Sequence, residues 1–215
     1  MPRMTPFRLY LVTDRTRTRG RPLLDVVEAA LAGGVEAVQL REKDLSTRQL
    51  YVLAVELRRL CNRHGARLLI NDRVDVAIAV GADGVHLPVA SFDPAAARKL
   101  LGPEGIIAAS THGVAEARAA QEDGADVIVC GPVFDTPSKR AYGQPLGVDR
   151  IAEVAREVDL PVLAIGGISA ERVGELRCQG AAGVAVVSAI LEAADPGAAA
   201  KQLVLALQAD AHSIS

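Results

Sequence analysis

Residues 67–87 read RLLINDRVDVAIAVGADGVHL, and they contain one complete unit of the fold. The run Arg67–Ile70 has the length of a buried strand, Arg73–Val80 has the spacing of a helix, and Gly84–Leu87 is a second short apolar run. Gly81 stands where the helix must end, because glycine readily adopts the left-handed backbone of a helix C-cap. A strand, a helix and a strand in close succession predict a parallel β/α/β unit.

The same alternation extends in both directions along the chain. Half of the 215 residues are hydrophobic but only 3% are aromatic, which favours parallel strands covered by Ala-rich helices. We predict eight strands, each followed by a helical segment: Phe7–Thr13, Ala37–Leu40, Arg67–Ile70, Gly84–Leu87, Ile106–Ser110, Asp126–Cys130, Pro161–Ile165 and Gly183–Val187. We expect helix caps at Ser46, Asp93, Ser169 and Asp195. Eight such pairs predict a single-domain (β/α)8 TIM barrel over residues 1–215.

The composition also excludes several classes of function. A net charge of −2 gives no electrostatic reason to expect nucleic acid or an anionic membrane as a partner. No apolar run approaches the roughly 20 residues of a membrane span. Cys61, Cys130 and Cys178 are widely spaced and form no C-x-x-C motif, which argues against a disulfide framework or a zinc site. We therefore expect a protein of the reducing cytoplasm.

Catalytic groups of such barrels lie where the strands end, so polar residues at those ends are the candidates. After the second strand, two-residue alternation sends Gln39, Arg41 and Lys43 the same way, which predicts a clamp for an anion. The alternative is a solvated strand end in which these cations pair with Glu42 and Asp44.

Oxygen donors follow the third strand, and hydroxyls and an imidazole follow the fifth. Asn71 and Asp72 suit Mg²⁺ bridged to substrate phosphates, although both are also common helix caps. At the fifth strand, Ser110 and His112 stand at the end, and His112 is suited to proton transfer near neutral pH. His86, inside the fourth strand, is interpreted as structural.

The ends of strands six to eight suggest a second anion site. The loop from Phe134 to Gly147 is the one long connection, and it contains two hydroxyls and a cation. Paired glycines end strand seven and a serine follows strand eight, where many barrels bind phosphate through backbone N–H groups. The candidates in this second site are Thr136, Pro137, Ser138, Lys139, Gly167, Val187 and Ser188.

In chain order, these residues resemble the thiamine phosphate synthase and TenI family from Tyr10 to Pro196. The resemblance implies the coupling of a hydroxymethylpyrimidine pyrophosphate to a carboxylated thiazole phosphate, giving thiamine monophosphate and pyrophosphate. It implies Mg²⁺ bound by Asp72, and a leaving group neutralised by Arg41 and Lys139. The pyrimidine pyrophosphate would contact Gln39, Arg41, Lys43, Asn71, Ser110 and Lys139. The thiazole phosphate would contact Thr136, Pro137, Ser138, Gly167, Val187 and Ser188.

One departure keeps other functions open. Where synthases of the family carry Gly-Gln-x-Asp after the fourth strand, this chain reads Pro88-Val89-Ala90-Ser91, so that Ser91 replaces a second Mg²⁺ carboxylate. The segment resembles the TenI branch, which implies a thiazole tautomerase with His112 as acid and base. A non-catalytic regulator that binds thiazole or thiamine phosphate, or another phosphate-binding barrel such as a sugar-phosphate epimerase, are further alternatives. We expect the synthase, because the clamp after the second strand is complete. The Ala-rich outer faces leave open whether the barrels form a homo-oligomer.

Overall fold

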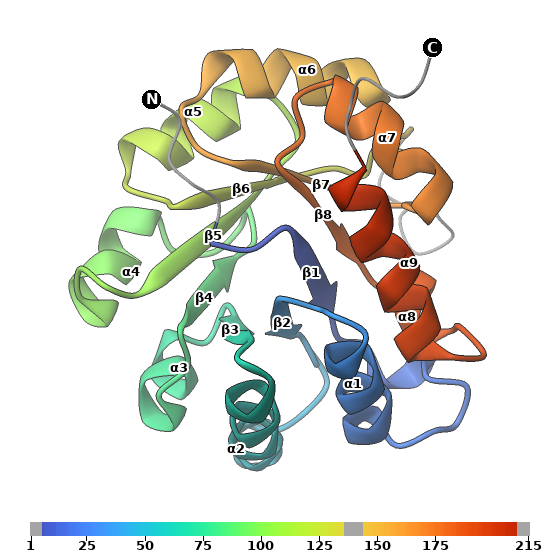
Figure 1. Cartoon of the computed structure of the whole chain (residues 1–215). Coiled ribbons are helices and arrows are strands. Elements are labelled where there is room, and N and C mark those ends of the chain that lie inside the picture. Colours follow the sequence, from blue (N-terminus) through green and yellow to red (C-terminus); the bar gives the residue numbers. More distant parts are fainter. Residues whose placement is uncertain (1–5, 136–143, 210–215) are drawn as a thin grey trace.

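The computed structural model describes residues 6–135 and 144–209, and its centre is a closed barrel of eight parallel strands (Figure 1). The strands follow one another around the barrel in sequence order, and the helices lie outside them. The barrel closes where Leu9 pairs with Val184 and Leu11 with Val186. This confirms the predicted (β/α)8 fold.

The strands have the bounds β1 Leu9–Val12, β2 Ala37–Leu40, β3 Arg67–Asn71, β4 Gly84–Leu87, β5 Ile106–Thr111, β6 Val127–Cys130, β7 Val162–Ile165 and β8 Gly183–Val186. Each lies within two residues of its predicted ends. The helices are α1 Leu23–Ala32, α2 Thr47–His64, α3 Val74–Val80, α4 Pro94–Leu101, α5 Val114–Glu122, α6 Val148–Glu157, α7 Ala170–Cys178, α8 Ser188–Leu191 and α9 Pro196–Gln208, with a 3₁₀ turn η1 at Arg15–Arg17. The prediction of one helix after each strand is wrong after β8, since the short α8 precedes α9.

Local side-chain signals explain the starts of α2, α4 and α9. Ser46 and Gln49 form a reciprocal capping box at the start of α2. Asp93 and Asp195 accept hydrogen bonds from backbone N–H groups in the first turns of α4 and α9. The expected cap at Ser169 is not formed by its side chain. Side-chain capping therefore stabilises the starts of α2, α4 and α9 but not the start of α7.

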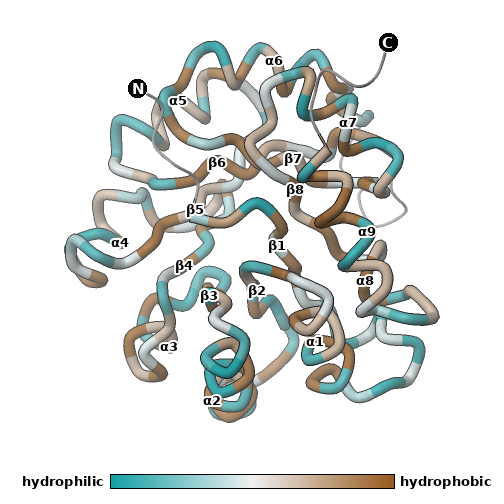
Figure 2. Tube along the Cα trace, in the orientation of Figure 1, coloured by the Kyte–Doolittle hydropathy of each residue, from teal (hydrophilic) through white to brown (hydrophobic). Residues whose placement is uncertain are grey.

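Apolar packing forms two layers. The outer layer lies between strands and helices, so each helix turns one hydrophobic face inward, as the alternating colours along the helices in Figure 2 indicate. The inner layer fills the barrel itself with Phe7, Tyr10, Leu69, Leu163 and several Val and Ala residues. Because the interior is packed, ligands are confined to the open end where the strands terminate. Among the described residues, no helix is long and apolar enough to cross a membrane.

The loop after β1 ties both sides of the closure together. The Arg21 guanidinium donates to the carbonyl oxygens of Leu191 at 2.8 Å and Ala194 at 3.2 Å, beyond β8. Helices α1 and α9 also pack closely against each other, so that a Cβ at Gly33 would lie 2.3 Å from the carbonyl oxygen of Gly197. Glycine is required at this helix crossing because only its absent side chain permits the approach.

Candidate functional site

A chain of hydrogen bonds joins four strands near the C-terminal end of the barrel. The Gln39 side-chain amide donates to the Tyr10 hydroxyl at 3.3 Å, which lies 3.4 Å from Nδ1 of His86. On the other side of the ring, Nε2 of His86 lies 2.7 Å from Oγ of Ser110. The structure thus brings together Gln39 and Ser110, two predicted site residues, through two residues that were not predicted to serve the site.

The two linking residues are buried and uncharged. Burial, together with the smaller effect of the nearby positive charge of Arg41, lowers the pKa of His86 to about 3. Burial also raises the pKa of Tyr10 far above its usual value, against a smaller opposing effect of the Gln39 hydrogen bond. The imidazole and the phenol therefore stay neutral at physiological pH, and Arg41 supplies positive charge beside them.

Two carboxylates beside the predicted clamp are paired with an arginine from the 3₁₀ turn that follows β1. Arg15 makes two hydrogen bonds of 2.6 Å to the carboxylate of Asp44, and its Nη1 lies 3.1 Å from Glu42. The Arg15 backbone N–H also donates to Glu42, whose side chain is only 2% exposed. Within the described part of the chain, neither Arg41 nor Lys43 forms an ion pair. The alternative in which these cations pair with Glu42 and Asp44 is wrong, and both remain available to an anion.

The polar pair at the end of β3, Asn71 and Asp72, does not cap the helix that follows. Helix α3 begins after Arg73 with no side-chain cap, so neither Asn71 nor Asp72 serves the helix. Asp72 adopts a left-handed backbone with φ of 65°, an uncommon conformation for a residue with a side chain. Its carboxylate accepts a hydrogen bond from the Ser91 hydroxyl. The residue in place of the family's second carboxylate therefore contacts the predicted metal ligand.

This donor set fits Mg²⁺ only with help from a substrate. Among residues 6–135 and 144–209, no three His, Cys, Asp or Glu side chains are placed to hold a metal ion by themselves. Asp72 supplies one exposed carboxylate, and Ser91 supplies a hydroxyl next to it. Protein-bound Mg²⁺ commonly has one or two carboxylates, with water and substrate phosphates completing its shell. The residues present therefore match a metal that arrives with a diphosphate.

The end of β7 places Gly167 against the loop that follows β6, and Ser188 follows the end of β8. Gly167 has φ of 66°, and a Cβ there would lie 2.8 Å from Cβ of Phe134 and 2.9 Å from the carbonyl oxygen of Asp135. Arg172 lies 4.3 Å from the centre of the Phe134 ring and donates to the Gly167 carbonyl at 2.6 Å. The half-buried Ser188 begins α8, where backbone N–H groups lack partners inside the helix.

The remaining predicted residues are not brought into this arrangement. Thr136, Pro137, Ser138 and Lys139 lie outside the described residues. His112 is exposed, and its Nδ1 lies 3.2 Å from Glu116 one turn along α5. Its catalytic role stays a prediction.

Sequence reasoning missed Tyr10, His86 and Arg15 as parts of the site. Two-residue alternation contained the signal for the first two, because it places Tyr10 and His86 on the inner face of β1 and β4. No local pattern marks Arg15, because its partners lie 27 and 29 residues away. Arg15 can be identified as part of the site only from the fold, in which the ends of β1 and β2 lie close together.

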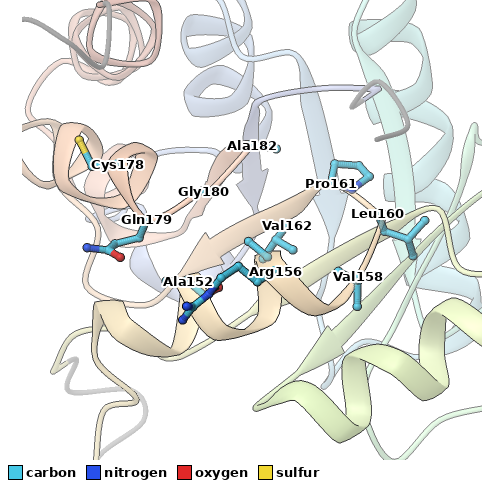
Figure 3. A pocket seen from close by; sticks show the side chains of 11 residues that line it. Ala152, Arg156, Val158, Leu160, Pro161, Val162, Cys178, Gln179, Gly180 and Ala182 are labelled. Atoms are coloured by element: carbon cyan, nitrogen blue, oxygen red, sulfur yellow. The ribbon is translucent and has the colours of Figure 1, made fainter. Parts of the chain in front are cut away.

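A separate pocket lies at the opposite end of the barrel. Its volume is about 750 Å³, and it is lined by residues between α6 and α7, including Arg156, Pro161, Gln179 and Ala182 (Figure 3). Pro161 and Ala182 precede β7 and β8, so the pocket lies where strands begin. It is therefore distinct from the candidate site.

Comparison with known proteins gives consistent matches. Residues 9–190 match the family described as thiamine monophosphate synthase. The chain is 54% identical over 201 residues to a putative thiamine-phosphate synthase of Geobacter sulfurreducens, covering 94% of each protein. It is 46% identical to a thiamine-phosphate synthase of Chloroflexus aurantiacus, covering 92% of this chain and 91% of that one.

A solved structure agrees with these matches. Thiamine phosphate pyrophosphorylase from Pyrococcus furiosus superposes with a TM-score of 0.86 at 35% identity, covering 94% of this chain and 96% of that one. A 3-hexulose-6-phosphate synthase of Salmonella typhimurium, at 19% identity and a TM-score of 0.71, shares the fold alone.

Proposed function

The chain belongs to the thiamine monophosphate synthase family, and on that premise we propose that it is a thiamine-phosphate synthase. The reaction joins a hydroxymethylpyrimidine pyrophosphate to a carboxylated thiazole phosphate. The bond between the pyrimidine methylene carbon and the pyrophosphate oxygen breaks, and a bond from that carbon to the thiazole nitrogen forms. The bond from the thiazole to its carboxylate also breaks, and CO2 leaves, so that the products are thiamine monophosphate, pyrophosphate and CO2. The observation that carries the proposal beyond family membership is a pair of cations at the end of β2, Arg41 and Lys43, that form no ion pair with any of the residues the structure describes.

The electrostatics of β2 suit a departing pyrophosphate. Arg15 forms ion pairs with both Glu42 and Asp44, so these two carboxylates are held away from their sequence neighbours Arg41 and Lys43. Cations fixed where negative charge develops lower the barrier, because they need no reorganisation as the bond breaks. We assign Arg41 and Lys43 to the pyrophosphate, with Gln39, Asn71 and Ser110 around the pyrimidine portion.

Asp72, with Ser91 beside it, would hold Mg²⁺ in this site. When bound, the metal would neutralise charge on the pyrophosphate. A single protein carboxylate implies that affinity for the metal depends strongly on the diphosphate. Metal and pyrimidine substrate should therefore bind cooperatively.

The thiazole phosphate belongs at the other side of the barrel mouth. Gly167 lets the backbone approach closely, and Val187 and Ser188 begin a helix whose first N–H groups favour an anion. From the sequence we add Thr136, Pro137 and Ser138 to this thiazole site, and we assign Lys139 to the pyrimidine pyrophosphate. Two anion sites facing each other would align the thiazole nitrogen with the pyrimidine carbon.

A coupled assay tests the proposal. Purified protein, both phosphorylated substrates and Mg²⁺ should release pyrophosphate and form thiamine monophosphate in equal amounts. Arg41→Gln should reduce kcat/KM about 100-fold, since one removed charge-stabilising donor typically costs two to three powers of ten. Arg48→Gln, on the exposed surface of α2, is the matched control and should change nothing.

The tautomerase is the competing function, because Ser91 replaces a carboxylate that synthases carry. Aromatisation of the thiazole tautomer without pyrophosphate release, abolished by His112→Asn, would overturn the synthase proposal. Binding of either substrate without turnover would favour the regulator instead. We place the enzyme in the cytoplasm, since Cys61 and Cys130 are buried free thiols.

A further inference from the structure

We propose that Tyr10 and His86 are positioning residues that fix the direction of the hydrogen-bond chain, so that the Ser110 hydroxyl donates its proton to the substrate. The inference deepens the proposed function, because Ser110 is assigned there to the pyrimidine pyrophosphate. It concerns which atoms carry protons in a chain of four side chains: Gln39, Tyr10 and His86, which are buried, and Ser110, which is not.

The direction begins at Gln39. Its side-chain nitrogen can only donate, and it faces the Tyr10 hydroxyl at 3.3 Å. Tyr10 is fully buried and accepts this bond, so its own single proton is directed to the remaining neighbour, Nδ1 of His86 at 3.4 Å. A buried phenol whose proton had no acceptor would cost the free energy of an unmade hydrogen bond.

The direction then passes through the imidazole. A neutral ring carries one proton, and Nδ1 is already an acceptor, so the proton lies on Nε2. Nε2 is 2.7 Å from Oγ of Ser110, a short contact that requires a proton between the two atoms. His86 is 4% exposed and stays neutral, so it acts as a relay of orientation and not as an acid.

The direction ends at the barrel mouth. Ser110 is the one member of the chain that is not buried, and its oxygen accepts from His86. Its proton is left for a group outside the chain. Ser110 therefore presents a donor to an acceptor atom of the pyrimidine substrate or its pyrophosphate. If the amide of Gln39 were reversed, every bond would reverse and Ser110 would become an acceptor.

Nitrogen NMR on the ligand-free protein reads the direction. In protein labelled with ¹⁵N-histidine, the His86 signal is assigned by its loss in His86→Gln. We expect Nε2 to show a directly bonded proton and Nδ1 to resonate as an unprotonated nitrogen. Tyr10→Phe, which keeps the ring, should increase the population protonated at Nδ1. A wild-type ring protonated at Nδ1, or at both nitrogens, would overturn the proposal. This measurement needs no substrate, so it stands apart from the success of the synthase assay.

A double-mutant cycle tests the positioning role. Loss of one neutral hydrogen bond predicts a fall in kcat/KM of about three- to tenfold for Tyr10→Phe. Because Tyr10 acts through Ser110, the Tyr10→Phe/Ser110→Ala double variant should be no slower than Ser110→Ala alone. Additive losses would show that Tyr10 does not act through Ser110 and would contradict the proposal. Tyr51→Phe, on the exposed face of α2, is the control and should match wild type.

Discussion

The hydroxyl of Ser91 donates a hydrogen bond to the carboxylate of Asp72, so the loop after β4 contacts the end of β3 at the barrel mouth. Sequence alone placed Ser91 at the position of a missing carboxylate. The contact adds that this position lies against the one carboxylate that remains. A side chain at residue 91 can therefore bind the same metal ion as Asp72.

Ser91→Asp should strengthen Mg²⁺ binding. A second carboxylate beside Asp72 adds a charged oxygen ligand, and we expect the Mg²⁺ concentration for half-maximal activity to fall about tenfold, within the range of effects seen for groups around metal ligands. Titration of the initial rate with Mg²⁺ measures it. Ser91→Asn has the same size without the charge and should not lower the requirement. An unchanged dependence in Ser91→Asp would show that residue 91 does not reach the metal.

Arg15→Gln should weaken binding of the pyrimidine pyrophosphate. Without the guanidinium, Glu42 and Asp44 are free to attract Arg41 and Lys43, and we expect KM to rise about two- to fivefold, the scale of a partly exposed ion pair. The rise should shrink at high salt. Steady-state kinetics at two ionic strengths measure both effects.

Arg17→Gln is the control for that change. Arg17 lies in the same 3₁₀ turn but pairs with Glu192, at 2.5 Å, on the other side of the loop. The Arg17→Gln variant should leave KM for the pyrimidine substrate unchanged. In the Arg15→Gln/Glu42→Gln double variant, KM should recover, and a failure to recover would mean that Arg15 contributes in another way.

Acid should break the ion pair between Arg15 and Asp44. The hydrogen bonds from Arg15 lower the pKa of Asp44 from 3.8 to about 2. A carboxylate with a lowered folded-state pKa stabilises the protein above pH 3.8, and this stabilisation is lost as the pH falls towards 2. The urea midpoint should therefore fall less between pH 4 and pH 2 in Asp44→Asn than in wild type. Equal falls would indicate that the ion pair does not contribute to stability.

Gly167→Ala should impair both folding and the thiazole site. Its φ of 66° is unfavourable for alanine, and the added Cβ would meet Phe134 and Asp135. We expect a loss of about 2–5 kcal/mol in unfolding free energy, combining backbone strain with overpacking. KM for the thiazole phosphate should rise.

Gly65 is a matched control because it has the same φ of 66° with nothing within 4 Å of an added Cβ. Gly65→Ala should cost only the backbone strain, about 1–2 kcal/mol, with unchanged KM. Urea denaturation and steady-state kinetics of both variants separate strain from contact. Equal losses in the two variants would show that the packing around Gly167 is not critical.

The strands were predictable because short apolar runs bounded by glycine have few other solutions; β4, for example, has its predicted bounds, Gly84–Leu87. Helix α8 was not, because four residues are too short to show a helical period. Gln39, predicted as a site residue from its place at the end of the second strand, donates a hydrogen bond to Tyr10 in the fold.

The site was less predictable than the fold, because its partners are distant in sequence. Glu42 and Asp44 flank the clamp residues, so sequence suggested them as partners for Arg41 and Lys43. In the fold, their partner is Arg15, from the neighbouring strand's loop. His86 shows a related limit: the sequence indicates a buried histidine, but only the contacts with Tyr10 and Ser110 indicate which nitrogen carries its proton.

The closure of the barrel between β1 and β8 has a consequence for synthesis on the ribosome. Leu9–Val12 emerges early, but one of its two edges stays unpaired until Gly183–Val186 has been made. At ordinary translation speeds that delay is on the order of ten seconds or more. During it the apolar strand LYLV is an open edge, a form that readily pairs with other chains. Pairing with β2 covers only the other edge of β1, so the edge that faces β8 stays open until the last strand has been made.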